Sequence, residues 1–292
     1  MRGGVAYLNQ DVSAIGTQFG GGGSPSLRET LRDVARVVPD PGGEGSVYAA
    51  WRKAQAVAAD SLEPEMGNPG GGSDFAGFYN HLGIPHLDWG FGGLYGVYHS
   101  QYDNFAWMSR FGDPGFVRHA TSASVGAALM LRLANADVLP YDYVEFARTM
   151  RGYLPAMATA ATAHGWDVSM TPLEEAIGRM ETAAAAFQQA RDARLASGAP
   201  AAGVLARTNA ALMRVERALT RPEGLRTRPW FRGLIYAADE NNGYSDMIFP
   251  TVSEAIRAED RPLTEREIAD LAARFDAAAA ALDQALQALG GS

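Results

Sequence analysis

The chain has 292 residues, a formal net charge of −8 at pH 7 and no cysteine. Its length fits one or two domains, and its composition, 47% hydrophobic and 20% charged, is ordinary for a globular protein. The negative charge argues against a nucleic-acid partner. The lack of cysteine excludes disulfides and thiolate chemistry without fixing the compartment. No apolar run reaches the roughly 18 residues of a membrane span, and the first residues do not resemble a signal peptide.

The first predicted element is a strand. Residues Val5 to Leu8 form a short apolar run without helical period, and Asn9, Gln10 and Asp11 follow it. Ligands of open α/β sheets bind beyond the carboxyl ends of the strands, so Asp11 is a candidate site residue. A turn or capping aspartate is the alternative interpretation of this residue.

Two helices are predicted next. The glycine run from Gly20 to Ser24 indicates a flexible loop, because the Gly-Lys-Ser/Thr of a phosphate-binding loop does not follow. Residues Ser26 to Glu29 fit a capping box, and apolar residues at helical spacing predict a helix as far as about Val38. Ser46 can cap a second helix.

A glycine-rich stretch leads into another helix and strand. Ser73 follows Gly70 to Gly72 and opens a short helix that Gly83 ends, so N-capping accounts for Ser73 without any other role. Residues Ile84 to Asp88 predict the next strand.

The stretch from Gly90 to Asp103 combines four glycines, four aromatic residues and one histidine, His99. Glycine allows the backbone to approach a ligand closely, and neutral imidazole is the commonest metal ligand. A ligand histidine usually donates its other ring N–H to a carboxylate, and Asp103 is close enough in sequence to accept it. A surface or packing histidine is the alternative.

The segment Gly96-Val97-Tyr98-His99-Ser100, with Asp103 and Phe111-Gly112-Asp113-Pro114 after it, resembles the last zinc-ligand segment of the glutamate carboxypeptidase and transferrin receptor family. That family contains di-zinc, aminopeptidase-fold metallopeptidases and non-enzymatic relatives. Further segments match in the same order, so the resemblance extends over nearly the whole chain. It does not extend over the whole family, whose first ligand segments have no counterpart here.

The resemblance implies a role for individual residues. Asp11 and His99 are each expected to bind one zinc ion, and Tyr98 to donate a hydrogen bond to the tetrahedral intermediate. Substrate-binding and supporting roles fall to five further residues: Gly72, Ser73 and Tyr244 against the substrate, and Asp74 and Asp103 behind the ligands.

Other features of the resemblance weaken a strict preference for glutamate. The family's glutamate-preferring peptidases carry arginines in the stretch that matches Asp88 to Leu94, and a lysine before the tyrosine that matches Tyr244. This sequence has neither. The triplet His86-Leu87-Asp88 imitates the His-x-Asp of the first zinc ligands, but it lies downstream of Asp11, where the family has a strand instead.

Residues from Gly115 to about Asp137 predict a long helix, and the remainder is rich in alanine and helix-forming. Capping boxes are expected at Thr171 to Glu174 and at Thr264 to Glu267. Four amphipathic helices with one apolar face each predict a bundle. This half resembles the transferrin receptor-like dimerisation domain, which implies an isologous homodimer.

The expected fold class is therefore α/β plus all-α. Residues 1–140 would form the C-terminal part of a zinc-peptidase domain with a partial doubly wound sheet, and residues 141–292 a helical dimerisation domain. The family's co-catalytic site needs two zinc ions, a bridging carboxylate and a general base. The pair Glu174-Glu175 lies in a predicted bundle helix and is a poor candidate for that base.

The predicted function is thus that of part of a zinc exopeptidase, carboxypeptidase- or dipeptidase-like, acting on peptides. This chain alone is expected to be inactive, to be the C-terminal portion of a longer peptidase and to require a missing N-terminal half. A non-catalytic, receptor-like or scaffold homodimer is the alternative.

Overall fold

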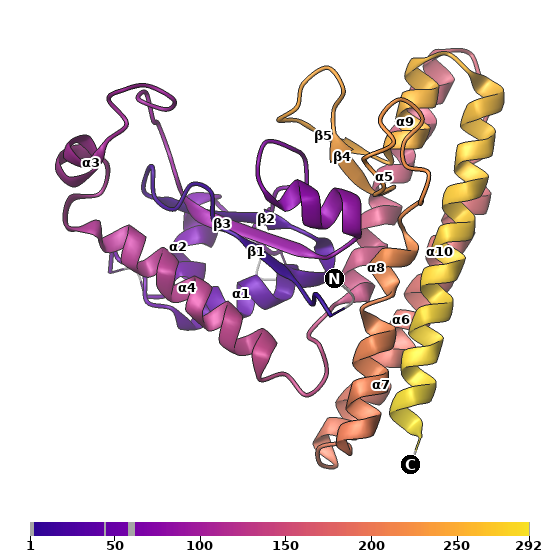
Figure 1. Ribbon diagram of the computed structural model, residues 1–292, viewed down its shortest axis with the longest axis horizontal. Coiled ribbons are helices and arrows are strands. Elements are labelled where there is room, and N and C mark those ends of the chain that lie inside the picture. Colours follow the sequence, from indigo (N-terminus) through magenta and orange to yellow (C-terminus); the bar gives the residue numbers. More distant parts are fainter. Residues whose placement is uncertain (1–2, 44, 58–61, 292) are drawn as a thin grey trace.

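The computed structural model describes residues 3–43, 45–57 and 62–291. Figure 1 shows a small sheet with its helices on one side and a bundle of long helices on the other. The sheet contains β1 (Tyr7–Asn9), β3 (His86–Gly92) and β2 (Gln18–Gly23), in that spatial order. Strand β3 pairs parallel with β1 and antiparallel with β2. The doubly wound peptidase sheet expected from the resemblance stays a prediction.

Strand β3 divides the sheet into an apolar face and a polar face. Side chains alternate along a strand, so Leu87, Trp89 and Phe91 point to one face and His86 and Asp88 to the other. The apolar three are buried, and Phe91 packs edge-on against Phe19 of β2. The opposite face of both strands consists largely of glycine. One face therefore carries the core, and the other leaves room above the backbone.

Three helices cover the apolar face: α1 (Arg28–Val37), α2 (Val47–Ala54) and α4 (Val117–Ala134). Trp51 of α2 packs edge-on against Phe19, with ring centroids 5.3 Å apart. A Cβ at Gly126 of α4 would lie 2.9 Å from the Trp89 ring, so glycine lets this helix approach the sheet. The predicted long helix is confirmed as α4. The predicted cap at Ser46 is also confirmed, because its side chain accepts a hydrogen bond from the Ala49 N–H.

The glycine run is a strand and not the flexible loop that its composition suggested. Residues Gly20 to Gly23 pair in register with Gly90 to Leu87. Gly23 has φ of +130°, and a Cβ there would lie 2.2 Å from the carbonyl oxygen of His86. Gly21, Gly22 and Gly23 lack side chains because helix α1 and the neighbouring backbone lie too close to them, which a single sequence does not reveal.

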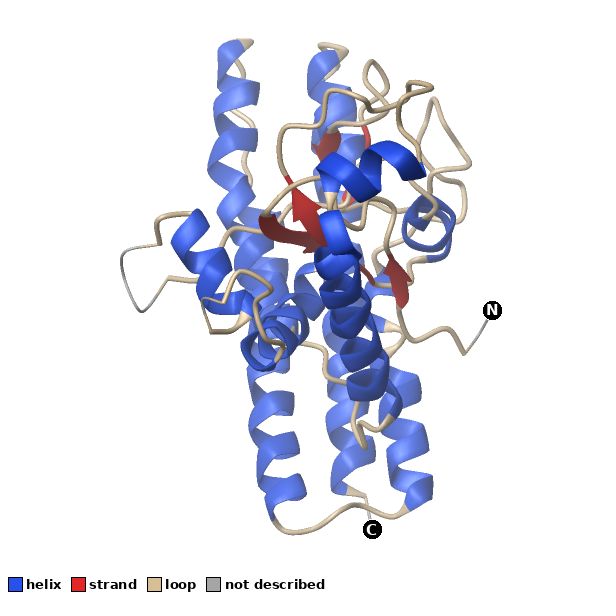
Figure 2. Cartoon of the chain, turned by 90° about the vertical axis from the view of Figure 1, so that its left-hand side faces the viewer, coloured by secondary structure: helices blue, strands red, loops and turns tan. Residues whose placement is uncertain are grey.

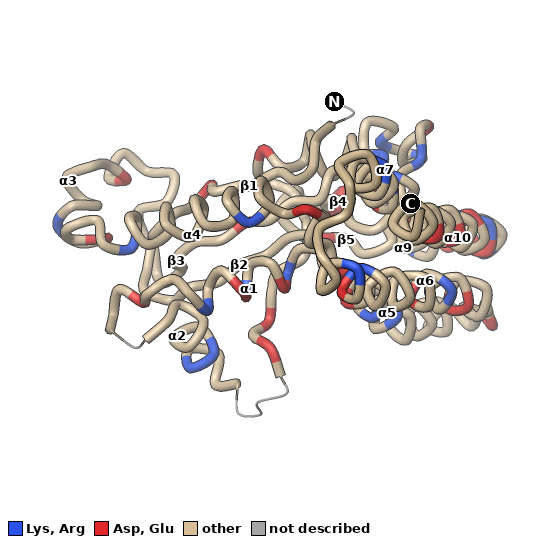
Figure 3. The backbone as a smooth tube through the Cα atoms, turned by 90° about the horizontal axis from the view of Figure 1, so that it is seen from below, with Lys and Arg blue, Asp and Glu red and all other residues tan. Residues whose placement is uncertain are grey.

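The second half is the helical bundle that was predicted, seen as near-vertical columns in Figure 2. Its long helices are α5 (Tyr143–Ala163), α6 (Thr171–Ala196) and α10 (Arg261–Gly290), joined by the shorter α7 (Ala202–Leu212) and α8 (Val215–Ala218). The apolar stripes of α6 and α10 are buried against one another. Acidic and basic residues both occur along these helices (Figure 3). None of the described helices is long and apolar enough to cross a membrane.

Three expected capping boxes are wrong. The Ser26 hydroxyl donates to buried Glu216, and α1 begins two residues later without a side-chain cap. Helix α6 likewise starts after Met170 without one. Helix α10 begins at Arg261, where Asp260 accepts from the Leu263 N–H, so Thr264 lies inside the helix. Tertiary contacts and an earlier cap displaced these local patterns.

The remaining elements connect the two halves. Helix α9 (Pro250–Arg257) precedes α10, and the hairpin of β4 (Tyr236–Ala238) and β5 (Asp246–Ile248) lies between the bundle and the sheet (Figure 1). A π-helical turn, η2 (Gly77–His81), follows the segment that opens with Ser73. Short helical turns from Phe105 to Phe116, including α3 (Phe105–Trp107), form an excursion between β3 and α4.

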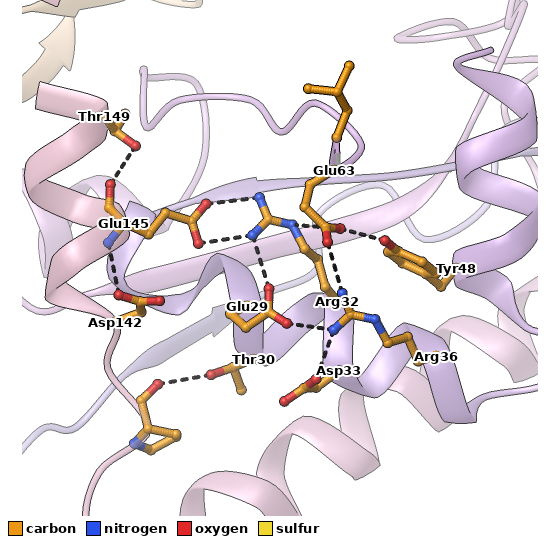
Figure 4. Close-up of polar contacts among 12 residues, drawn as sticks. Glu29, Thr30, Arg32, Asp33, Arg36, Tyr48, Glu63, Asp142, Glu145 and Thr149 are labelled. Carbon is orange, nitrogen blue, oxygen red and sulfur yellow. Dashed lines mark hydrogen bonds and ion pairs between the residues drawn. The ribbon is translucent and has the colours of Figure 1, made fainter. Parts of the chain in front are cut away.

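A buried guanidinium ties α1 to the bundle. Arg32 donates from Nη1 and Nη2 to the two carboxylate oxygens of Glu145 on α5, each at 2.9 Å (Figure 4). Its side chain is only 8% exposed, and Glu29 and Glu63 lie within ion-pair distance as well. Arg36 extends the network to Glu63. Bidentate pairing fixes the orientation of the two helices, since both hydrogen bonds require one geometry.

A buried carboxyl forms a second connection. Glu216 of α8 is 4% exposed and accepts a hydrogen bond from Ser26, and its Oε2 has no partner among the described residues. Burial raises the pKa of Glu216 to about 7, against the opposing effect of the hydrogen bonds from Ser26 and Ser24. Near neutral pH this group therefore sits between its neutral and charged forms in the folded chain.

Gly23→Ala should destabilise the fold strongly. The new Cβ would meet the His86 carbonyl at 2.2 Å in a backbone conformation that L side chains rarely adopt. We expect a loss of about 3 kcal/mol or more in the free energy of unfolding, measured by urea denaturation. The matched control is Gly20→Ala in the same strand, where nothing lies within 4 Å of the added Cβ. Equal effects of the two substitutions would contradict the packing described.

Glu216→Gln should remove a pH dependence of stability. The folded pKa of about 7 lies above the ordinary value of 4.5, so the folded chain binds more protons and loses stability as the pH rises between these values. The substitution should stabilise the chain at pH 8 by up to about 3 kcal/mol and have little effect at pH 4.5. Thermal unfolding across this range measures it. Exposed Glu223→Gln is the control and should leave the pH profile unchanged.

Candidate functional site

A cavity of about 520 Å³ lies over the polar face of the sheet. Its floor is the glycine-rich backbone of β2 and β3, and its walls come from four other segments of the chain. Residues lining it include Asp11, Gly72, Ser73, Tyr98 and Tyr244, which the sequence had placed in a site. The fold thus brings together five of the eight predicted site residues.

The floor of the cavity carries a polar network that sequence reasoning missed. Asn9, at the end of β1, donates from Nδ2 to Asp88 Oδ2 at 2.7 Å and to the Ser73 hydroxyl at 3.1 Å. Asn9 and Asp88 are register partners on adjacent strands. Burial raises the pKa of Asp88, and the hydrogen bonds from Asn9 and the Trp89 backbone oppose that shift. This network fixes Ser73 relative to the sheet.

The alternation in β3 could have revealed this part of the site. The sequence from His86 to Gly92 places His86, Asp88, Gly90 and Gly92 on the face opposite three large apolar residues. A charged residue among glycines on one face of a buried strand indicates a ligand-facing surface. The triplet His86-Leu87-Asp88 lies in the predicted strand Ile84 to Asp88, and its resemblance to a metal motif is the only site feature it offered there.

One wall is formed by two segments far apart in the sequence. A Cβ at Gly71 would lie 2.1 Å from the Gly243 carbonyl oxygen, and one at Gly72 would lie 2.7 Å from the Tyr244 ring. Asn68 Nδ2 also donates to Asp246 Oδ2 at 3.0 Å. The loop between β4 and β5 therefore packs against the glycine segment at the cavity.

The two tyrosines of the cavity lie together at its mouth. Tyr98 is 50% exposed and Tyr244 67% exposed. Side-chain hydrogen bonding with Tyr244 raises the pKa of Tyr98, with smaller contributions from desolvation and from the charge of Asp11. The Tyr98 hydroxyl thus stays protonated at neutral pH. Asp11 is exposed at the end of the segment that follows β1.

His99 lies beside the cavity and does not line it. Its backbone has φ of +58°, and its ring stacks on Tyr98 with centroids 3.8 Å apart. Asp103 accepts a hydrogen bond from the Tyr95 hydroxyl. Desolvation, and then this hydrogen bond, raise the pKa of Tyr95 to about 12. Asp74 is exposed and outside the lining. The supporting roles of Asp74 and Asp103 stay predictions.

The comparisons with known proteins agree in pointing to one family. Residues 168–283 match the model of the transferrin receptor-like dimerisation domain. The Arabidopsis thaliana protein named "Probable glutamate carboxypeptidase LAMP1" is 37% identical over 254 residues, 86% of this chain. "Probable glutamate carboxypeptidase AMP1" from the same plant is 31% identical over 259 residues, also 86% of the chain. "Aminopeptidase NAALADL1" of Rattus norvegicus is 27% identical over 265 residues, again 86% of the chain.

The chain belongs to the glutamate carboxypeptidase and transferrin receptor-like family. The alignments cover 35% of each of these three relatives, so the chain spans about a third of their length. The resemblance stated from short motifs is thereby confirmed at the level of the family.

The described residues do not form a complete metal site. No group of three or more His, Asp and Glu side chains suited to a metal ion occurs among them. A structural or catalytic zinc ion needs at least three protein ligands in this family's chemistry, and Asp11 and His99 would supply one to each of two ions. The residues present are thus too few to fit zinc by themselves, and no reaction step through a metal follows from this chain.

Two other candidates from the sequence are placed clearly. His86 is 1% exposed and stacks on Phe75 at 4.2 Å, and burial lowers its pKa to about 3. It is therefore neutral at physiological pH, and it lines the cavity. Glu174 and Glu175 are exposed in the first turns of α6, in the bundle and outside the cavity lining.

Asn9→Ala should destabilise the chain by about 1–3 kcal/mol, because it leaves the Asp88 carboxylate without its amide partner at a half-buried position. Guanidinium unfolding at pH 7 measures the loss. The control is Asn135→Ala at the exposed end of α4, which should change stability by less than about 0.5 kcal/mol. The Asn9 effect should shrink as the pH falls into the acid range, because the raised pKa of Asp88 means that protonation removes its charge earlier than for an ordinary aspartate. A pH-independent effect would contradict the network.

Proposed function

We propose that this chain supplies the substrate cleft and two zinc ligands of a zinc-dependent exopeptidase that is carboxypeptidase- or dipeptidase-like. The remaining ligands and the general base come, in this proposal, from polypeptide outside this chain. The printed names of the relatives, which are carboxypeptidases and an aminopeptidase, support a peptidase. The coverage of about a third of their length supports a partial site.

The observation that carries the proposal is the shared cavity. Asp11, Gly72, Ser73, Tyr98 and Tyr244 come from four separate segments, yet all of them line it. Motif resemblance alone predicts each of these residues to be a site residue. Residues chosen for unrelated reasons would not be expected to converge on one cavity at the carboxyl ends of β1 and β3, where α/β sheets bind ligands.

Each residue has a role that its position permits. The protonated Tyr98 hydroxyl donates to the oxyanion of the tetrahedral intermediate. The backbone of Gly72 and the Ser73 side chain face the backbone of the substrate, with Asn9 holding Ser73 in place. Tyr244 closes the mouth of the cavity against Gly72. Asp11 and His99 bind one zinc each once the other ligands are present.

The match to the dimerisation domain supports a homodimer through residues 141–292. The same match equally supports the alternative function, that of a non-catalytic scaffold dimer. The two differ in whether the cavity residues matter for hydrolysis, which an activity measurement decides.

The test is reconstitution of the site. The chain is co-expressed with the part of the Arabidopsis relative that lies outside the alignment, and the complex is assayed for zinc-dependent hydrolysis of a peptide mixture by mass spectrometry. His99→Ala should lower kcat/KM by more than about 100-fold, since even outer-shell changes cost 10–100-fold. The control is His164→Ala, an exposed histidine in the bundle.

The isolated chain with added zinc should be inactive. Hydrolysis by the isolated chain would contradict the incomplete site. A reconstituted complex that is dimeric by light scattering, binds no zinc and is inactive would favour the scaffold. Activity that survives His99→Ala would remove this residue from the site.

A further inference from the structure

The charge of the cavity bears on which substrate it accepts. Among the described residues that line it, Asp11 and Asp88 are acidic and none is lysine or arginine. His86 is neutral because burial lowers its pKa to about 3. Arg28 contacts the lining residue Asn68 at 2.9 Å, but it does not itself line the cavity. The cavity therefore presents negative charge to its contents.

Of the two acidic lining residues, Asp88 is the one held in place by strand pairing and a side-chain hydrogen bond. It lies in the middle of β3 between register partners Asn9 and Gly22, and Asn9 donates to its Oδ2 at 2.7 Å. No ion pair with a basic residue is formed by Asp88 within the described part of the chain. A carboxylate accepts about four hydrogen bonds, so the bonds from Asn9 and the Trp89 backbone leave capacity unused. A half-buried carboxylate without a cation is costly, and a cationic ligand would relieve that cost.

A second observation, an unpaired polar atom in the cavity lining, also points to a ligand. The Nδ1 atom of His86 has no hydrogen-bond partner among the described residues, although the side chain is only 1% exposed. His86 and Asp88 are alternate residues of one strand and line the same cavity. Buried polar atoms in folded proteins are nearly always paired, so an unpaired one beside a cavity points to a missing partner.

Two glycines on the same face as Asp88 leave space above the strands. An added Cβ would meet nothing within 4 Å at Gly20 and nothing closer than 3.9 Å at Gly92, whereas the carbonyls of Val12 and Gly67 cover Gly90 and Gly22. A ligand can therefore approach the backbone at Gly20 and Gly92, and Asp88 lines the same cavity.

We propose that Asp88 selects substrates by binding a positively charged ammonium group, so that the cavity prefers a free amino terminus or a basic side chain and disfavours an acidic residue. This rests on the proposed function in taking the cavity as the substrate site. It assigns the chain a substrate class that differs from the glutamate in the names of its plant relatives.

The test measures binding to the whole chain without zinc or turnover. Four probes are titrated at pH 6.5 and followed by NMR, which detects millimolar affinity. L-leucinamide carries an α-ammonium, Nα-acetyl-L-lysinamide carries a side-chain ammonium, and N-acetyl-L-leucinamide carries no charge. N-acetyl-L-glutamate serves as the anionic probe. At least one ammonium probe should bind about tenfold or more tightly than the uncharged and anionic probes.

Asp88→Asn keeps the shape of the side chain and removes its charge, so the preference should fall to less than about twofold. Asp137→Asn removes one negative charge at an exposed position outside the cavity and should preserve the preference. Circular dichroism and thermal unfolding establish that both variants fold. Should Asp88→Asn fail to fold, the ranking of the four probes on the unsubstituted chain still decides the question.

Tighter binding of the α-ammonium probe would assign the pocket to an amino terminus, and tighter binding of the lysine probe to a basic side chain. Equal binding of all four probes, preference for glutamate, absence of binding, or a preference that survives Asp88→Asn would each overturn the inference. None of these results depends on zinc-dependent hydrolysis. If the reconstituted complex showed no hydrolysis, the proposed exopeptidase function would be wrong, but the measured preference for ammonium probes would be unaffected.

Discussion

The pairing of β3 with β1 and β2 is the constraint on which the rest of this structure depends. It places Leu87, Trp89 and Phe91 in the core and His86 and Asp88 on the opposite face. A shift of one residue in register would exchange these sets and bury the carboxylate among apolar helices. The apolar side therefore holds the strand in the register that creates the polar cavity.

The cavity also depends on how the sheet is held against the bundle. Arg32 and Glu145 join α1 to α5 through a bidentate pair, and Ser26 reaches Glu216 of α8. Buried charges add little net stability because of their desolvation, but each pair admits only one arrangement. That arrangement brings the loop carrying Tyr244 from the bundle half over the glycine segment at Gly72. Contacts well away from the cavity thus decide where its wall lies.

Glycine shapes the cavity of this protein mainly because it has no side chain. In β2 and β3 it removes side chains from the cavity floor, and at Gly71 and Gly72 it lets two backbone segments meet. The resulting space is lined by aromatic rings, amides and two carboxylates, without a basic side chain among the described lining residues. Shape and charge together make this a site suited to a small polar ligand with an ammonium group.

The sequence by itself determined the helical bundle, the helices after residues 26, 46 and 115, and the family, because amphipathic spacing and short motifs are local properties. It also selected Asp11, Gly72, Ser73, Tyr98 and Tyr244, which the fold places around one cavity. Only the tertiary structure decided that Gly20 to Gly23 form a strand, that Ser26 donates to Glu216 instead of capping a helix, and that Asn9 pairs with Asp88 of the cavity lining. The reason is physical: strand pairing, close approach of backbones and buried hydrogen bonds join residues that are distant in the chain, and local propensity carries no record of those partners.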